Sequence, residues 1–183
     1  MGLNFFENEQ CVSRVEEFGV IDPPKDKSTA KKTCDISYDN DKKDDWDISV
    51  LSNNRDDIFF NAIDGNIEFF RSWKPNEKHR ACDAMIHTAD TIIFIEIKKW
   101  RNDSIEKNGR DVHFIDDAIE QLENTIIHFC TAHPDKKFDN KYAYVSNKYK
   151  DKPKFPITHK QKMACFQDNT NGFKLRVASE ISL

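Results

Sequence analysis

The chain has 183 residues, a length that suits one domain, and hydrophobic residues make up 38% of it, which excludes a disordered chain. No stretch approaches the roughly 20 apolar residues of a membrane-spanning helix, and the N-terminus lacks a basic-then-apolar pattern, so we expect neither a membrane span nor a secretion signal. Five cysteines are scattered singly without a Cys-x-x-Cys pair, which argues against a disulfide framework or a zinc knuckle and favours a cytoplasmic setting.

The formal net charge of −4 is the balance of two segments of opposite charge. Residues 34–64 hold nine Asp against three basic residues, and residues 135–162 hold nine Lys against three Asp. The first segment would repel phosphates and the second would attract them. The net charge therefore does not exclude a nucleic-acid partner. The simpler alternative is that both segments are solvated surface and pair with each other.

The first third of the sequence predicts two helices separated by a polar segment. Residues 4–19 place apolar side chains near helical spacing and end at a glycine, which predicts an N-terminal helix. Residues 20–47 are dominated by Lys, Asp, Ser and Thr, which predicts a polar loop or insertion. Residues 53–64 repeat apolar side chains at i, i+1, i+4 and i+5 before Gly65, which predicts a short helix.

The rest of the chain predicts a sheet with helices packed on it. Runs rich in β-branched and aromatic residues predict three consecutive antiparallel strands, at residues 66–73, 80–87 and 91–100. An amphipathic helix follows at residues 115–130, then a strand at 141–147. A short helix at 159–167 and a strand at 172–178 end the chain. We therefore expect a single α/β or α+β domain over residues 1–183, with a central mixed sheet flanked by helices.

The hairpin formed by the second and third of these strands carries the chemistry. If its loop consists of Ala89 and Asp90, Asp83 faces Glu96 across the strands. Directly opposed side chains have Cβ atoms about 4.5–5.5 Å apart, where like charges are destabilising unless something compensates them. Because strand side chains alternate, Lys98 shares the face of Glu96 and Asp83. Two acids and a lysine are therefore expected to converge on one spot.

Glu96 also interrupts a strand that is otherwise apolar on both faces, so its carboxylate is expected to be buried. A divalent cation would resolve this conflict, since Mg²⁺ is bound by one or two carboxylates with waters and phosphates. Two alternatives stay open: Lys98 alone neutralises Asp83 and Glu96 as a buried charge cluster, or a longer loop gives another register.

These residues resemble the PD-(D/E)XK family of metal-dependent nucleases, which has the restriction-endonuclease-like fold. Cys82-Asp83 stands where the family has Pro-Asp, and Glu96-Ile97-Lys98 supplies the second half of the motif. The resemblance implies a nuclease-like core over residues 53–147, with Mg²⁺ or Mn²⁺ held by Asp83 and Glu96. It also implies that Lys98 orients or activates the attacking water.

Gln121 is similar to the Gln that recombination-type exonucleases and junction resolvases of this family carry on the helix after the lysine, but their companion Tyr is absent. Many members also supply an upstream acid, for which Asp56, Asp57 and Glu17 are candidates. His87, four residues along the strand from Asp83, is a further candidate to border the site.

We therefore expect a Mg²⁺-dependent nuclease that hydrolyses phosphodiester bonds of nucleic acid, with DNA as the expected substrate. The basic segment at residues 136–162, interleaved with Tyr142, Tyr144, Tyr149 and Phe155, is the candidate nucleic-acid contact, unless the tyrosines only pack. The alternative function is a non-catalytic binding or immunity-type protein that keeps the fold, with the acidic segment replacing a nucleic-acid surface. An oligomer or a protein partner is compatible with either function.

Overall fold

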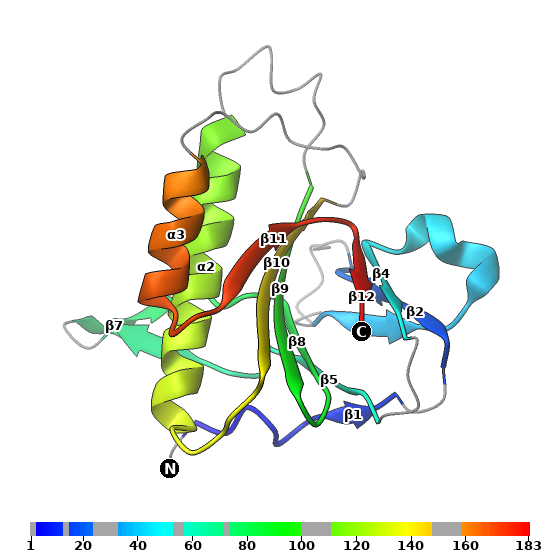
Figure 1. Ribbon diagram of the computed structural model, residues 1–183, viewed down its shortest axis with the longest axis horizontal. Helices are drawn as coiled ribbons and strands as arrows, with labels where there is room; N and C mark the ends of the chain where they lie inside the picture. The colour runs from blue at the N-terminus through cyan, green and yellow to red at the C-terminus, as the bar shows by residue number, and fades with distance from the viewer. Residues whose placement is uncertain are drawn as a thin grey trace.

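The computed structural model describes residues 3–12, 15–23, 33–52, 57–71, 74–99, 111–147 and 159–183. It has an α+β architecture in which a six-stranded mixed sheet lies between a pair of helices and a second, four-stranded mixed sheet (Figure 1). No helix within these ranges has the length and apolar character needed to cross a membrane.

The six-stranded sheet has the order β1-β5-β8-β9-β10-β11. The pairs β1–β5, β5–β8 and β8–β9 are antiparallel, and β9, β10 and β11 are mutually parallel. The bounds of these strands are β1 Gln10–Cys11, β5 Phe59–Ala62, β8 Ala84–His87, β9 Thr91–Lys98, β10 Asn140–Asn147 and β11 Lys174–Val177. β9 is central and buried over residues 92–97, which explains its continuous apolar sequence.

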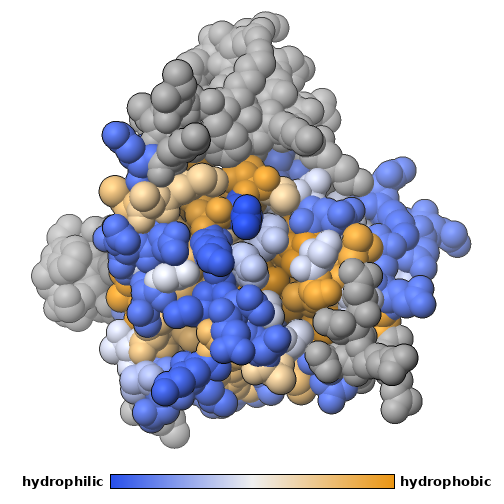
Figure 2. Space-filling view, in the orientation of Figure 1, coloured by the Kyte–Doolittle hydropathy of each residue, from blue (hydrophilic) through white to orange (hydrophobic). Residues whose placement is uncertain are grey.

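Two helices cover one face of this sheet. α2 (Asp111–Ala132) makes the crossover between the parallel strands β9 and β10, and α3 (His159–Asn169) lies beside it (Figure 1). The apolar stripe of α2, which includes Leu122 and Ile126, packs on Phe94 of β9 in the first of two core clusters. The outer surface of α3 is mainly hydrophilic (Figure 2), as expected for a helix with one buried side.

The second sheet covers the opposite face in the order β12-β4-β2-β3. Its strands are β2 Glu17–Ile21, β3 Asp35–Ser37, β4 Ile48–Leu51 and β12 Glu180–Ser182, with a 3₁₀ helix, η1, at Asn40–Asp45. Phe18 and Val50 from this sheet join Ile93 and Ile95 of β9 in the second core cluster. Gly19 lies under the ring of Trp46, where a Cβ would overlap the indole. A third, two-stranded sheet pairs β6 (Phe69–Arg71) with β7 (Lys74–His79).

Several elements predicted from the sequence are confirmed. The helices expected at 115–130 and 159–167 are α2 and α3, and the strands expected at 141–147 and 172–178 are β10 and β11. The hairpin register is also confirmed, because Met85 pairs with Phe94 and the Thr88 N–H donates to the Thr91 carbonyl.

Other expectations were wrong. No helix occupies residues 4–19 or 53–64 where the structure describes them: β1, β2 and β5 lie there instead. In the first segment Phe5 packs in one core cluster and Phe18 in the other, so the apolar residues belong to opposite faces of the sheet. In the second segment both faces of β5 are covered, and a strand buried on both sides produces a continuous apolar run that resembles a helical pattern.

The remaining differences concern irregular segments. The 20–47 stretch is not wholly loop, because β3 and η1 lie in its second half and Trp46 is buried. The strand expected at 66–73 is shorter, since β6 covers 69–71, and the following KPNEKH segment, expected to be a connection, is its partner β7.

Candidate active site

The strand that carries Asp83 departs from regular pairing at this residue. The β8–β9 ladder ends with Ala84 opposite Ile95, and the Asp83 N–H donates to the same Ile95 carbonyl at 3.0 Å. Two residues therefore face one, which is the arrangement of a β-bulge. In a regular strand, residues three apart point to opposite faces of the sheet. Cys82 and Met85 nevertheless both pack in the core cluster beneath α2, which agrees with one extra residue in the strand between them.

The expected direct opposition of Asp83 and Glu96 is therefore corrected. The Asp83 carboxylate accepts the Ile97 N–H at 2.5 Å, so it is anchored to the residue that follows Glu96. The Asp83 carbonyl accepts the N–H of Ile63, just beyond β5, at 2.8 Å. The bulge keeps the two acids on neighbouring strands without placing them directly opposite each other, where like charges repel most strongly.

Glu96 projects from the centre of the sheet toward α2 and is only 3% exposed. Its Oε1 lies 2.6 Å from the ammonium nitrogen of Lys98 and accepts a hydrogen bond from the Gln121 side-chain amide at 2.9 Å. Its Oε2 is buried and has no hydrogen-bond partner among the residues that the structure describes. Within the described part of the chain, Glu96 therefore has one oxygen with two donors and one oxygen with none.

Gln121 and Thr125 connect α2 to both strands of the hairpin. The Gln121 amide also donates to the Asp117 carbonyl at 3.1 Å, which fixes its direction along the helix. The Thr125 hydroxyl donates to the Gln121 carbonyl at 2.8 Å and accepts the N–H of Cys82, next to Asp83, at 2.9 Å. Glu96, Lys98 and Gln121 therefore form one cluster of side chains, to which the structure adds Thr125, and Asp83 is joined to it through the backbone of Cys82 and Ile97.

Burial dominates the electrostatics of both acids. Burial raises the pKa of Glu96 from 4.5 to about 7; Lys98 and then Arg80 pull it down, and the nearby charge of Asp64 pushes it up. Burial also raises the pKa of Asp83 well above its ordinary value, and the Glu96 charge adds to this effect. The Ile97 N–H lowers this pKa. Near neutral pH the two acids thus resist being ionised together.

The additional acids near the site are not those expected from the sequence. Asp64, whose N–H points at the Asp83 carbonyl at 3.4 Å, raises the pKa of Glu96, and Asp22 raises that of Asp83. Asp64 lies two residues beyond the end of β5, so reading residues 59–62 as a strand would have placed it near the hairpin. Asp22 lies at the end of β2, far away in sequence, and no local signal indicates it.

The candidates proposed for an upstream acid lie elsewhere. Glu17 forms an ion pair with Lys43 in the second sheet, and Asp57 borders a pocket near the hairpin turn. Asp56 lies outside the described residues. His87 is also remote from Glu96: it lies at the turn end of β8, with Nε2 2.9 Å from a carboxylate oxygen of Glu9.

The described tyrosines of the basic segment pack against the protein. Tyr142 and Tyr144 alternate along β10 and contact the second core cluster, with ring centroids 6.4 Å apart. Tyr149 and Phe155 lie outside the residues that the structure describes. Lys136, Lys137 and Lys141 border a pocket at the far end of the sheet from Lys98.

Asp83 and Glu96 are the residues that could hold a divalent cation here. The buried Oε2 of Glu96, which has no hydrogen-bond partner among the described residues, is a hard oxygen donor of the kind that Mg²⁺ prefers. The raised pKa values of both acids would fall beside a dication. In the described part of the chain no three His, Cys, Asp or Glu side chains form a ready set of ligands. Two carboxylates are nevertheless enough for Mg²⁺, which keeps several waters.

No protein-family model matches the chain, and no curated protein or solved structure is significantly similar to it.

Proposed function

We propose that the chain is a metal-dependent nuclease with a restriction-endonuclease-like core, and that it hydrolyses phosphodiester bonds of nucleic acid, with DNA as its substrate. The observation that carries the proposal is the state of Glu96, whose Oε1 is held by Lys98 and Gln121 while its buried Oε2 has no described partner. A carboxylate held in this way offers one oxygen to a cation.

The order of the elements supports the fold part of the proposal. Three antiparallel strands, β5, β8 and β9, lead through α2 to the parallel strand β10. The resemblance implies a helix, three strands, a helix and a strand over residues 53–147; the chain has three such strands, α2 and β10, but β5 lies where the leading helix was expected and the β6–β7 pair is inserted before β8. The motif halves lie on β9 and on the residue just before β8.

The roles follow from the contacts of each side chain. Asp83 and Glu96 would hold Mg²⁺ or Mn²⁺, which when bound polarises a phosphate and acidifies a water. The side chain of Lys98 is 12% exposed, and its ammonium would donate to the attacking water or to the developing phosphate charge. Gln121 orients the Glu96 carboxylate and is a positioning residue.

A cleavage assay with matched variants tests the proposal. Purified protein is incubated with Mg²⁺ or Mn²⁺ and with single-stranded DNA, double-stranded DNA or RNA. Glu96→Gln keeps the size of the side chain and should abolish cleavage, whereas Glu120→Gln, an exposed position on α2, should leave it unchanged. Cleavage that persists in Glu96→Gln, or that EDTA does not stop, would contradict the proposal.

One observation favours a non-catalytic function as the second candidate. The Lys98 ammonium already neutralises Glu96, with 2.6 Å between its nitrogen and Oε1. A cluster neutralised by its own lysine requires no cation. A chain that binds neither Mn²⁺ nor nucleic acid in a salt-dependent way would favour this candidate.

A further inference from the structure

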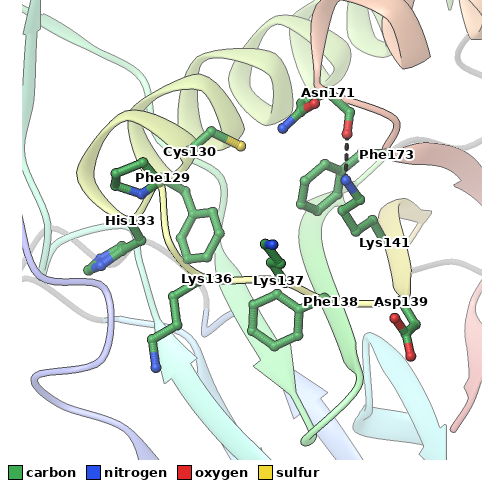
Figure 3. Close-up of a pocket in the computed structure, with 11 residues that line it drawn as sticks. Phe129, Cys130, His133, Lys136, Lys137, Phe138, Asp139, Lys141, Asn171 and Phe173 are labelled. Atoms are coloured by element: carbon green, nitrogen blue, oxygen red, sulfur yellow. Dashed lines mark hydrogen bonds between the residues drawn. The ribbon is translucent and has the colours of Figure 1, made fainter.

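A second site lies at the opposite end of the sheet, where α2 ends. A hollow of about 520 Å³ opens there between the last turns of α2, the 134–139 loop, β10 and the start of β11 (Figure 3). This volume lies within the range of about 300–1,000 Å³ that is typical of small-molecule sites. The hollow is lined by aromatic side chains and by lysines, and Asp139 is the one acid on its border.

The Lys141 ammonium is fixed at one wall of this hollow. It donates to the Asn171 carbonyl at 2.7 Å, in a turn where Asn171 has φ 54° and Gly172 has φ 88°. A Cβ at Gly172 would lie 3.7 Å from the Lys141 nitrogen, so the turn approaches the ammonium closely. Lys141 forms no ion pair with a described residue, and its ammonium also lies 5.8 Å from the centroid of the Phe173 ring. Its described hydrogen bond uses one of its three N–H groups, so it can still donate to an anion.

Lys137 supplies a second cation. It is exposed, forms no ion pair with any residue that the structure describes, and extends into the hollow in Figure 3. Its neighbour Lys136 points away, with its ammonium 4.9 Å from the centroid of the Phe6 ring. His133 also points away, because its Nε2 accepts the Phe5 N–H at 3.2 Å. Two of the lysines are therefore directed at the hollow and the third is not.

The walls of the hollow are aromatic. Phe129 and Phe173 are almost fully buried and form its floor, and Phe138 from the loop is half-buried, so part of its ring faces solvent. Two cations beside an accessible aromatic ring suit a ligand with a negative charge and a flat ring. The rings of nucleobases stack on aromatic side chains, and phosphates pair with lysine.

We propose that this hollow binds a nucleotide, with its phosphate between Lys137 and Lys141 and its base against Phe138. The same chemistry is offered by a free nucleoside monophosphate and by the phosphorylated end of a nucleic-acid strand. The hollow lies near the Thr91 end of β9, five residues from Glu96, which corresponds to about 17 Å along a strand. The nucleotide site is thus separate from the candidate active site. Binding there does not depend on the proposed nuclease activity of Glu96.

Calorimetric titration of the full chain tests the proposal with three probes: AMP, a 5′-phosphorylated oligothymidine and inorganic phosphate. The wild-type chain should bind AMP or the oligonucleotide saturably. Lys137→Gln and Lys141→Gln should each weaken this binding by about tenfold, the effect of losing one charge-assisted contact. Phe138→Leu should weaken AMP binding without changing phosphate binding. Tighter binding of the oligonucleotide than of AMP identifies a strand end, and the reverse identifies a free nucleotide.

Two controls keep the outcome clear. Lys136→Gln removes a lysine from the same loop that points away from the hollow, so it should change affinity by less than about twofold. Glu96→Gln should bind AMP as the wild type does, which separates this proposal from the proposed nuclease activity. Absence of saturable binding of both AMP and the oligonucleotide, or an equal loss in Lys136→Gln and Lys137→Gln, would overturn the proposal. Lys137 is exposed, so its substitution tests the site without endangering the fold.

Discussion

The Lys98 ammonium lies 2.6 Å from Oε1 of Glu96, two residues earlier on the same face of β9. Because Gln121 donates to this same oxygen, both donors leave the second carboxylate oxygen of Glu96 to another partner. The contact also holds the Lys98 ammonium beside the acids, where a positive donor can act on a phosphate. This relationship leads to the first prediction.

Lys98→Met should reduce cleavage by about 10²–10³-fold, because it removes the positive donor beside the reacting phosphate. It should not abolish Mn²⁺ binding, since Asp83 and Glu96 stay in place. The matched control is Lys99→Met, the adjacent lysine, which pairs with Asp22 3.1 Å away on the other side of the strand. Single-turnover cleavage rates and Mn²⁺ titrations measure the two effects. Equal rates in Lys98→Met and the wild type would remove Lys98 from the reaction.

Gln121→Leu should lower metal affinity and cleavage by about tenfold, because the Glu96 carboxylate loses the donor that orients it. The free energy of unfolding should fall by about 1–2 kcal/mol from the lost hydrogen bond in a buried setting. Gln161→Leu, an exposed position on α3, is the control. Retention of full metal affinity in a folded Gln121→Leu chain would show that Gln121 does not position Glu96.

The stability of the chain should depend on pH through Glu96. Its pKa is raised from 4.5 to about 7 on folding, so between these pH values the folded chain retains a proton that the unfolded chain releases. The free energy of unfolding therefore falls as pH rises through this window, by about 3 kcal/mol from this group. The side chain in Glu96→Gln does not titrate. The free energy of unfolding of this variant, relative to that of the wild type, should therefore increase between pH 5 and pH 8.

Urea unfolding at several pH values measures this difference. Adding Mn²⁺ at pH 8 should stabilise the wild type, because the cation favours the ionised acids, and should not stabilise Glu96→Gln. A difference between the two chains that is the same at pH 5 and pH 8 would mean that Glu96 does not titrate as described.

Gly19→Ala should destabilise the second sheet strongly, because the added Cβ would overlap the buried Trp46 ring. Overpacking of this kind costs about 1–3 kcal/mol or more. At Gly172 a Cβ meets nothing closer than 3.7 Å, so Gly172→Ala should cost only the strain of a φ of 88°, about 1 kcal/mol. Thermal unfolding ranks the stability of the two variants. A smaller loss of stability in Gly19→Ala than in Gly172→Ala would contradict the close packing of Gly19 against Trp46.

The hairpin and its helix were predictable because their signals are local. Ala89 and Asp90 fix the turn, the turn fixes the register, and the period of α2 places Gln121 beside its apolar face. The bulge at Asp83 was not predictable, since it depends on the Cys82 N–H reaching Thr125 on α2, a contact between distant segments. The register therefore placed Glu96 and Lys98 on β9 as expected, but it misplaced Asp83, which the bulge shifts from the position opposite Glu96.

The N-terminal half was misread because its strands are completed by distant partners. β1 pairs with β5, and β2 lies between β3 and β4, so the apolar residues at 4–21 are divided between two cores. The spacing of apolar residues within one segment cannot show which of the two cores each residue joins. The same error concealed Asp64, which follows β5, and Asp22, which follows β2.

Calorimetric titration with Mn²⁺ at pH 6 and pH 8 shows whether Asp83 and Glu96 bind a divalent cation, as we propose. We expect one site per chain, with tighter binding at pH 8, because the raised pKa values of both acids make the cation compete with protons. We also expect loss of the site in an Asp83→Asn/Glu96→Gln double variant that stays folded. Absence of Mn²⁺ binding by the wild type at pH 8, or unchanged binding by the double variant, would contradict the proposal.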